Sequence, residues 1–325
     1  QNSNYTGIAF KFDGSRSQGY KSGWYDANTP GCLCEGWGVG FRNSAGINVP
    51  AYVNVGQIGR PNINSSGIYR HWGSREASIK AKSFVRDETS ITSTVWVHDR
   101  GSKEEPMLEI THRYGPAANV PGVLFQALVT ITNISGATRT GIYYNRTMDW
   151  DVHPTEFNEL VTIKGVRASY TSGSEPRVRA SGNNGFMAPN VFSSFSAYTR
   201  NPKKGSEWAN KDYESSGPAD QGFTSTFKLG DLACGEAHTF MIYYGAAGNK
   251  AELEAAFATE GVPIYSIGQS SDRDSQGNSV SPSDVSYGFG FKGLSGSAIA
   301  PSLPTKIASL PGGAAKSSGW HTYAP

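Results

Sequence analysis

The sequence predicts an all-β fold, an antiparallel β-sandwich or jelly-roll-like body with one short amphipathic helix near residues 249–260. Three observations favour this class. Apolar and polar residues alternate with a period of two in many short segments. These segments recur about every ten to fifteen residues, separated by Gly, Asn, Ser or Pro, which is typical of sandwiches and barrels. The 39 glycines among 325 residues exceed the usual share and supply many turns.

The expected strands follow from this alternation. Within residues 88–97, Val95 and Val97 fall on one face and Thr94 and Trp96 on the other. In chain order, the expected strands are 5–12, 46–55, 77–85, 88–97, 107–114, 121–133, 138–152, 160–166, 223–229, 238–244 and 287–291. Many short strands with an apolar face favour two packed sheets.

One segment, residues 249–261, carries helical signals. Asn249 is placed to cap the first turn, Leu253 and Phe257 belong to a narrow apolar stripe, and Gly261 supplies the stop. We therefore expect a single helix packed on the β-body. The chain has no repeat of fixed period, which argues against a solenoid or propeller.

The chain divides into a body, residues 1–268, and a Ser/Gly/Pro-rich extension, residues 269–325, with one short strand at 287–291. Two stretches of the body, 171–185 and 203–222, are poor in apolar residues and are predicted to be long loops. The end of the extension is too rich in proline to form a core of its own.

The charge balance of the chain helps to exclude classes of binding partner. The formal net charge of +2, from 29 basic and 27 acidic residues, creates no field that would attract nucleic acid. No run approaches the roughly 18 apolar residues that span a bilayer. Because the chain begins at Gln1, we expect the mature form of a secreted, extracellular or cell-surface protein whose signal peptide has been removed.

Three cysteines predict one disulfide. Cys32 and Cys34 lie two apart and are poorly placed to bridge each other, so one of them is expected to pair with Cys234. Whether the partner is Cys34 or Cys32 stays open. The spacing does not match a zinc site, and a structural disulfide fits an exported protein.

The densest group of functional side chains surrounds Asp149 and Asp151. In a strand, these two residues would project from one face about 6.6 Å apart, with Trp150 projecting into the core. Three interpretations are open. The carboxylates form an exposed polar strand end, bind a cation or a sugar, or divide acid and base roles with Glu156 nearby.

A second acidic segment has the D-x-D-x-x-G pattern of calcium loops. Asp272, Asp274 and Asn278 would supply oxygen ligands, but Ser283 stands where a bidentate Glu is expected. A solvated linker is the competing interpretation. Calcium is the only cofactor that the sequence indicates.

Tryptophans offer another binding chemistry. Trp24, Trp37 and Trp72 lie in Gly-rich, turn-prone sequence, where an indole ring can stack on a sugar. Packing in the space that glycines leave empty is the alternative role. No histidine cluster, G-x-S-x-G elbow, P-loop or dinucleotide motif is present, so the sequence nominates no catalytic residue.

Three runs together, residues 31–38, 145–157 and 240–268, resemble exported bacterial proteins with a PEP-CTERM sorting signal, the substrates of the exosortase system. The resemblance spans about residues 31 to 291. It implies export, a surface or extracellular-matrix setting, and a link to biofilm or exopolysaccharide, and it supplies no catalytic residue. The Pro-Glu-Pro signal, apolar helix and basic cluster of that family do not appear in the tail of this sequence, so either processing has removed the anchor or this member is released or assembled without one.

Taken together, these features predict a secreted, non-enzymatic structural or adhesive protein that self-associates, with filaments as one outcome. Ile8, Phe10 and Phe12 share one face and would complete a neighbour's sheet by strand exchange. An extracellular carbohydrate-binding module is the first alternative, with polysaccharide as partner. A polysaccharide-active enzyme is the second.

Overall fold

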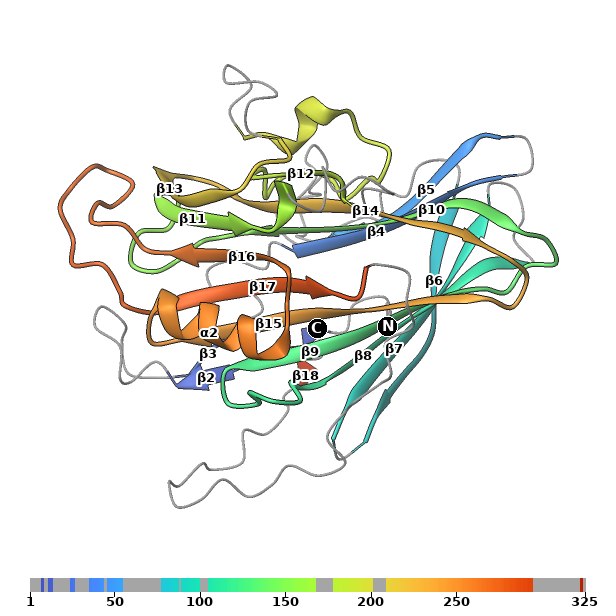
Figure 1. Cartoon of the computed structure of the whole chain (residues 1–325), viewed down its shortest axis with the longest axis horizontal. Coiled ribbons are helices and arrows are strands. Elements are labelled where there is room, and N and C mark those ends of the chain that lie inside the picture. Colours follow the sequence, from blue (N-terminus) through green and yellow to red (C-terminus); the bar gives the residue numbers. More distant parts are fainter. Residues whose placement is uncertain are drawn as a thin grey trace.

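In a computed structural model, the chain forms two antiparallel sheets that share one core (Figure 1). The structure describes residues 7–8, 11–13, 24–26, 35–43, 46–54, 77–87, 89–99, 105–167, 178–200, 209–294 and 322–323. The predicted all-β, sandwich-like class with a short helix is confirmed.

The larger sheet has nine strands, and the smaller sheet has five. In spatial order the larger sheet contains β13 (Tyr213–Ala219), β11 (Glu159–Lys164), β16 (Ile264–Gln269), β17 (Ser286–Lys292), β15 (Ala237–Ala247), β9 (Leu124–Asn133), β8 (Pro106–Pro116), β7 (Ile91–Asp99) and β6 (Ala77–Arg86). The smaller sheet contains β12 (Val178–Gly182), β14 (Gly222–Leu232), β10 (Arg139–Asp149), β4 (Glu35–Arg42) and β5 (Asn48–Asn54). Two short pairs join β1 (Gly7–Ile8) to β18 (Thr322–Tyr323) and β2 (Lys11–Asp13) to β3 (Trp24–Asp26).

The core lies between the inner faces of the two sheets and is rich in aromatic rings. Phe223 of the smaller sheet lies 6.1 Å from Phe289 and 6.0 Å from Phe291 of the larger sheet, measured between ring centroids. All three side chains are fully buried. Burial of a ring of this size contributes about 1.5–3 kcal/mol, so these contacts are a main source of stability.

Most strands lie where the alternation predicts them, including β5 to β11, β14, β15 and β17. The segment expected as one strand over 5–12 contains β1 and the start of β2 instead. The sequence does not predict β4, β12, β13 or β16. Strands β12 and β13 lie in the stretches 171–185 and 203–222, so the interpretation of those stretches as loops is wrong in part.

Strand β17 lies in the centre of the larger sheet, between β16 and β15. Residues up to 294 are therefore part of the β-body, although the sequence assigned everything after residue 268 to an extension. Residues 295–321 of that extension lie outside the described part of the chain.

Glycines on the outer face of the larger sheet make room for helix α2 (Lys250–Glu260). In β17, Phe289 points into the core, whereas Gly288 and Gly290 lie under the helix. A Cβ atom at Gly288 would lie 2.7 Å from the Phe257 ring, and one at Gly290 would lie 2.7 Å from Val262. The helix can pack this closely only because these positions have no side chain.

In the smaller sheet, glycines of β4 also make room for a segment packed on the outer face. A Cβ atom at Gly38 would lie 1.9 Å from the carbonyl oxygen of Pro189, and one at Gly40 would lie 2.4 Å from Val191. The irregular segment 183–200 therefore lies directly on the outer face of this sheet. These glycines make the sequence of β4 resemble a turn, but in the structure they leave space for the backbone of the segment 183–200.

Helix α2 has the predicted caps. The Asn249 side chain accepts a hydrogen bond of 2.9 Å from the Glu252 backbone N–H, and Gly261 ends the helix in the left-handed region with φ of 66°. Among the described residues, no helix is long and apolar enough to cross a membrane.

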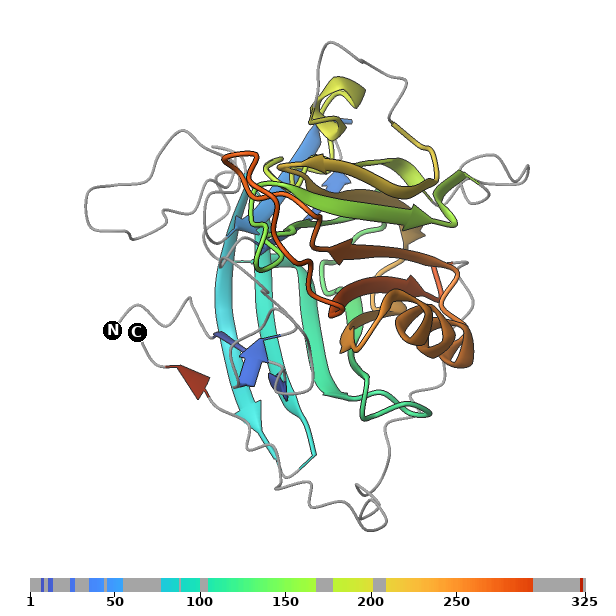
Figure 2. The same ribbon diagram turned by 90° about the vertical axis from the view of Figure 1, so that its left-hand side faces the viewer.

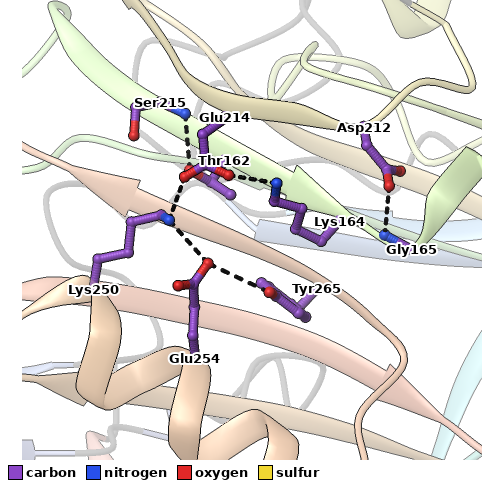
Figure 3. Close-up of polar contacts among 9 residues, drawn as sticks. All are labelled: Thr162, Lys164, Gly165, Asp212, Glu214, Ser215, Lys250, Glu254 and Tyr265. Atoms are coloured by element: carbon purple, nitrogen blue, oxygen red, sulfur yellow. Dashed lines mark hydrogen bonds and ion pairs between the residues drawn. The ribbon is translucent and has the colours of Figure 1, made fainter.

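Ion pairs connect the start of α2 to the edge of the larger sheet (Figure 3). Lys250 pairs with Glu254 at 2.9 Å and also with Glu214 of β13, which pairs in turn with Lys164 of β11. The Tyr265 hydroxyl donates to Glu254 at 3.4 Å. Pairs this exposed contribute little individually, but together they fix the helix against β11, β13 and β16.

Candidate functional site

Asp149 and Asp151 lie at the end of β10 beside a core residue, Trp150. The predicted burial of Trp150 is confirmed, with no exposed surface. The interpretation of the two carboxyls as an exposed strand end is wrong, because they expose only 3% and 4% of their surface. Gly222 of the neighbouring strand β14 pairs with Asp149, and Gly185 of the segment 183–200 packs against its backbone, so this segment covers the position.

These two carboxyls belong to an acidic cluster with the buried Glu159 and the partly exposed Asp220, which pairs with Arg200 at 2.9 Å. Burial raises the pKa of Asp149 to about 8, and the charges of Asp151 and Asp220 add to this rise. Burial also raises the pKa of Asp151 to about 6 and that of Glu159 to about 10, although the Gln221 backbone N–H donates to Glu159 at 2.7 Å. One oxygen of each of the four carboxyls has no hydrogen-bond partner. Asp149 and Glu159 are therefore mainly protonated at neutral pH.

Glu156, the expected catalytic companion of this pair, lies elsewhere. Its side chain is in a partly exposed turn, where it pairs with His153. Asp149 and Asp151, in contrast, are covered, so a polymer does not reach them in this conformation. The structure does not assemble the three residues into one accessible acid–base site.

The acidic loop around Asp274 is a self-contained turn. The Asp274 carboxylate accepts hydrogen bonds from the Gln276 N–H at 3.0 Å, the Asn278 N–H at 2.8 Å and the Asn278 side chain at 2.9 Å. The hydrogen bond from the Asn278 side chain is the main cause of a lowered Asp274 pKa. Asp272 is exposed beside this turn. In the described ranges, no group of three or more His, Cys, Asp and Glu residues is placed to hold a metal ion, and calcium binding stays a prediction.

The predicted tryptophan and cysteine sites are only partly described. Trp37 packs toward the core, with its ring centroid 4.9 Å from that of His112, which favours the packing role. Trp24 belongs to β3, and Trp72 lies outside the described residues. Cys234 is a free, exposed cysteine in the turn between β14 and β15. Its expected partners, residues 32 and 34, are outside the described residues, so the disulfide stays a prediction.

Sequence reasoning missed a buried charged cluster between the two sheets. Arg146 of β10 pairs with Glu35 of β4 and donates to the hydroxyl of Tyr244 in β15. That hydroxyl donates to Glu35 at 2.9 Å, and His112 and the Tyr144 hydroxyl lie 3.0 Å apart beside it. Because these residues come from both sheets, the cluster fixes how the sheets face each other.

The accessible candidate site is on the outer side of the larger sheet. Helix α2 covers β15, β16 and β17, whereas the cyan strands β6 and β7 lie at the other end of that sheet (Figure 2). We call the outer face of β6 to β9, together with Thr239 of the neighbouring strand β15, the polar face. Its residues on β6 to β9 are Lys80, Lys82, Ser83, Val85, Thr92, Thr94, Trp96, Glu109, Thr111, Arg113, Leu128, Thr130 and Thr132. The alternate residues of these strands, such as Val97, Ile110 and Val129, belong to the core.

A row of hydroxyl groups crosses the polar face at right angles to the strands. Ser83, Thr94, Thr111, Thr130 and Thr239 are directly paired, one on each of β6, β7, β8, β9 and β15. We call these five residues the hydroxyl row. The Thr94 and Thr111 oxygens lie 3.4 Å apart. Because neighbouring strands lie about 4.8 Å apart, the row is about 19 Å long.

Trp96 lies beside the hydroxyl row and is held in place by charged neighbours. Its indole N–H donates to Glu109 at 2.9 Å, and the Lys82 ammonium lies 5.1 Å from the ring centroid. Partial burial alone would raise the pKa of Glu109, but hydrogen bonds from Lys82 and Trp96 outweigh burial and lower it. The charged Glu109 therefore fixes a partly exposed ring on this sheet face, next to Thr94, which is only 7% exposed.

The period-two pattern already places Thr94 and Trp96 on one face of their strand. It does not predict which residues of the neighbouring strands pair with them, and the hydroxyl row forms only because these strands pair in this register.

No family model matches this chain, and the search of curated proteins found no significant match.

Proposed function

We propose that this protein is a non-enzymatic adhesive protein of the cell surface or extracellular matrix, and that the polar face binds polysaccharide. The observation that carries the proposal is the fixed, partly exposed Trp96 ring beside a row of five hydroxyl groups. Sugars bind proteins by stacking their apolar faces on aromatic rings while polar groups satisfy their hydroxyls. The polar face offers both kinds of contact on one side of the sheet.

The chemistry of the polar face favours a sugar polymer over other partners. A protein interface of this size usually has an apolar centre, whereas the centre of this face is a line of threonines. A row of about 19 Å is long enough to contact several sugar units at once. Export and a link to exopolysaccharide, implied by the resemblance to PEP-CTERM proteins, agree with this proposal.

Trp96→Ala is expected to weaken polysaccharide binding by about tenfold or more, because the stacking surface is lost. Binding of the wild type and the variant to a panel of soluble polysaccharides, measured by affinity electrophoresis and calorimetry, checks this. Phe195→Ala is the matched control, since Phe195 is an exposed ring on the segment that covers the smaller sheet. Absence of binding to any polysaccharide, or equal losses in both variants, would contradict the proposal.

Self-association is a second candidate function, favoured by the pairing of the two chain ends. Gly7 pairs with Tyr323 and Ile8 with Thr322, so β1 and β18 form a ladder of two residues each. Because this ladder is so short, β1 of one molecule can readily pair with β18 of another copy in place of its own β18. Phe12 lies in β2, and Phe10 lies outside the described residues.

Deletion of residues 1–12 is expected to reduce any assembled particle to the size of a monomer, because β1 is removed. Light scattering of the full chain and the truncated chain at matched concentrations measures this. If the full chain assembles and the truncated chain gives particles of the same size, exchange of the terminal strand is not the mechanism.

A further inference from the structure

Arg113 lies at the border of the polar face and has spare hydrogen-bonding capacity. It projects from β8 between Thr92 of β7 and Leu128 of β9. Its Nε–H donates to the Ser90 hydroxyl at 3.2 Å. Within the described part of the chain, its two terminal nitrogens make no hydrogen bond and no ion pair. The guanidinium is therefore held at one end, with its terminal fork free for a ligand.

The carboxylates near Arg113 are already engaged. Asp87 accepts hydrogen bonds from the side chain of Ser90 at 2.7 Å and from the backbone of Thr89 at 2.8 Å. The hydrogen bond from the Ser90 side chain is the main cause of a lowered Asp87 pKa, about 2, so this carboxylate is charged and capped by its own turn. Glu109, across the hydroxyl row, is held by Lys82 and Trp96.

The charges flank the hydroxyl row on both sides. Lys80 and Lys82 lie on the side of Trp96, and Arg113 lies on the opposite side. The cations of this face are therefore Lys80, Lys82 and Arg113, and the carboxylates beside them are Glu109 and Asp87.

We propose that the ligand of the polar face is an acidic polysaccharide that lies along the hydroxyl row and places a carboxylate against the terminal nitrogens of Arg113. This inference rests on the proposed function and adds the chemical class of the ligand. A planar guanidinium binds a carboxylate through two parallel hydrogen bonds, which a neutral sugar cannot accept in the same way. The hydroxyl row and Trp96 supply affinity for the sugar backbone, and Arg113 supplies the preference for charge.

Polygalacturonate and its methyl ester are suitable probes, because they share one backbone and differ only at the carboxyl group, which is charged in the first and an uncharged ester in the second. Wild-type protein is expected to bind polygalacturonate about tenfold more tightly than the ester, as measured by calorimetry. Arg113→Gln is expected to remove that preference, so that the variant binds the two polymers with similar affinity. Arg113→Lys keeps the charge and should restore part of the preference. Arg42→Gln is the charge-matched control, since Arg42 is exposed on the smaller sheet.

The outcomes separate this inference from the proposed function. Equal binding of both polymers by the wild type, lost in Trp96→Ala, would support a sugar-binding face and overturn the choice of an acidic ligand. Equal losses in Arg113→Gln and Arg42→Gln would also overturn it, because only net charge would then matter. Binding of neither polymer, nor of any other polysaccharide, would contradict the proposed function itself. Melting temperatures of all variants establish that each is folded.

Discussion

Gly38→Ala is expected to lower the free energy of unfolding by about 3 kcal/mol, at the upper end of the range for overpacked sites. The new Cβ atom would lie 1.9 Å from the carbonyl oxygen of Pro189 and 3.1 Å from the Cβ atom of Tyr52. Because the first of these is a backbone atom, no rotamer change relieves the clash. Either β4 or the segment 183–200 has to move. Urea denaturation of the wild type and the variant measures the difference.

Gly136→Ala is the matched control for this prediction. No atom lies within 4 Å of a Cβ built at Gly136, and its backbone is not in the left-handed region. Alanine there is expected to be neutral, or to stabilise by about 0.4–1 kcal/mol by restricting the unfolded chain. A loss below about 0.5 kcal/mol for Gly38→Ala would show that the covering segment is not seated on β4 as described.

The protein is expected to be more stable at pH 5 than at pH 8, by several kcal/mol. The folded pKa values of Asp149, about 8, and Asp151, about 6, both lie above the ordinary value of 3.8. The folded state therefore holds protons that the unfolded state releases. This contribution is fully present below pH 3.8 and is lost as the pH rises toward 8. Chemical denaturation at a series of pH values measures the slope.

The double variant Asp149→Asn, Asp151→Asn is expected to reduce this slope, because amides keep the shape without a titrating proton. The third cluster member, Glu159, retains its own contribution, since its folded pKa is about 10. Glu105→Gln, at an exposed carboxyl, should leave the slope unchanged. Equal slopes in the wild type and in this double variant would contradict the burial of these carboxyls.

The sequence predicts the fold class well because period two is a local property of a strand. The prediction of individual strands fails where glycines lie inside a strand and not in a turn. In β4, Gly38 and Gly40 resemble turn residues, yet they lie in a strand whose outer face is covered by other backbone. The strands β12 and β13, within the segments 171–185 and 203–222, are also missed by the alternation. They lie at sheet edges and have little apolar sequence.

The candidate site is harder to predict from sequence than the fold. Thr94 and Trp96 are placed on one face by alternation, but the contacts of Trp96 with Glu109 and Lys82 depend on strand register, which the sequence does not fix. For Asp149 and Asp151, the local pattern correctly places Trp150 in the core. The loops that bury the two carboxyls come from distant parts of the chain, so their burial is not visible in the local pattern.

Strand β17 also limits the ways in which this chain can misfold. Its side chains alternate between large rings, as at Phe289 and Phe291, and no side chain at all, as at Gly288 and Gly290. A shift of one residue against β15 would turn the rings toward α2, where no space exists, and would leave the core with empty positions. Each shift by an odd number of residues is therefore penalised twice, by a clash and by a cavity. The same glycines that seat the helix thus fix which face of the central strand points into the core.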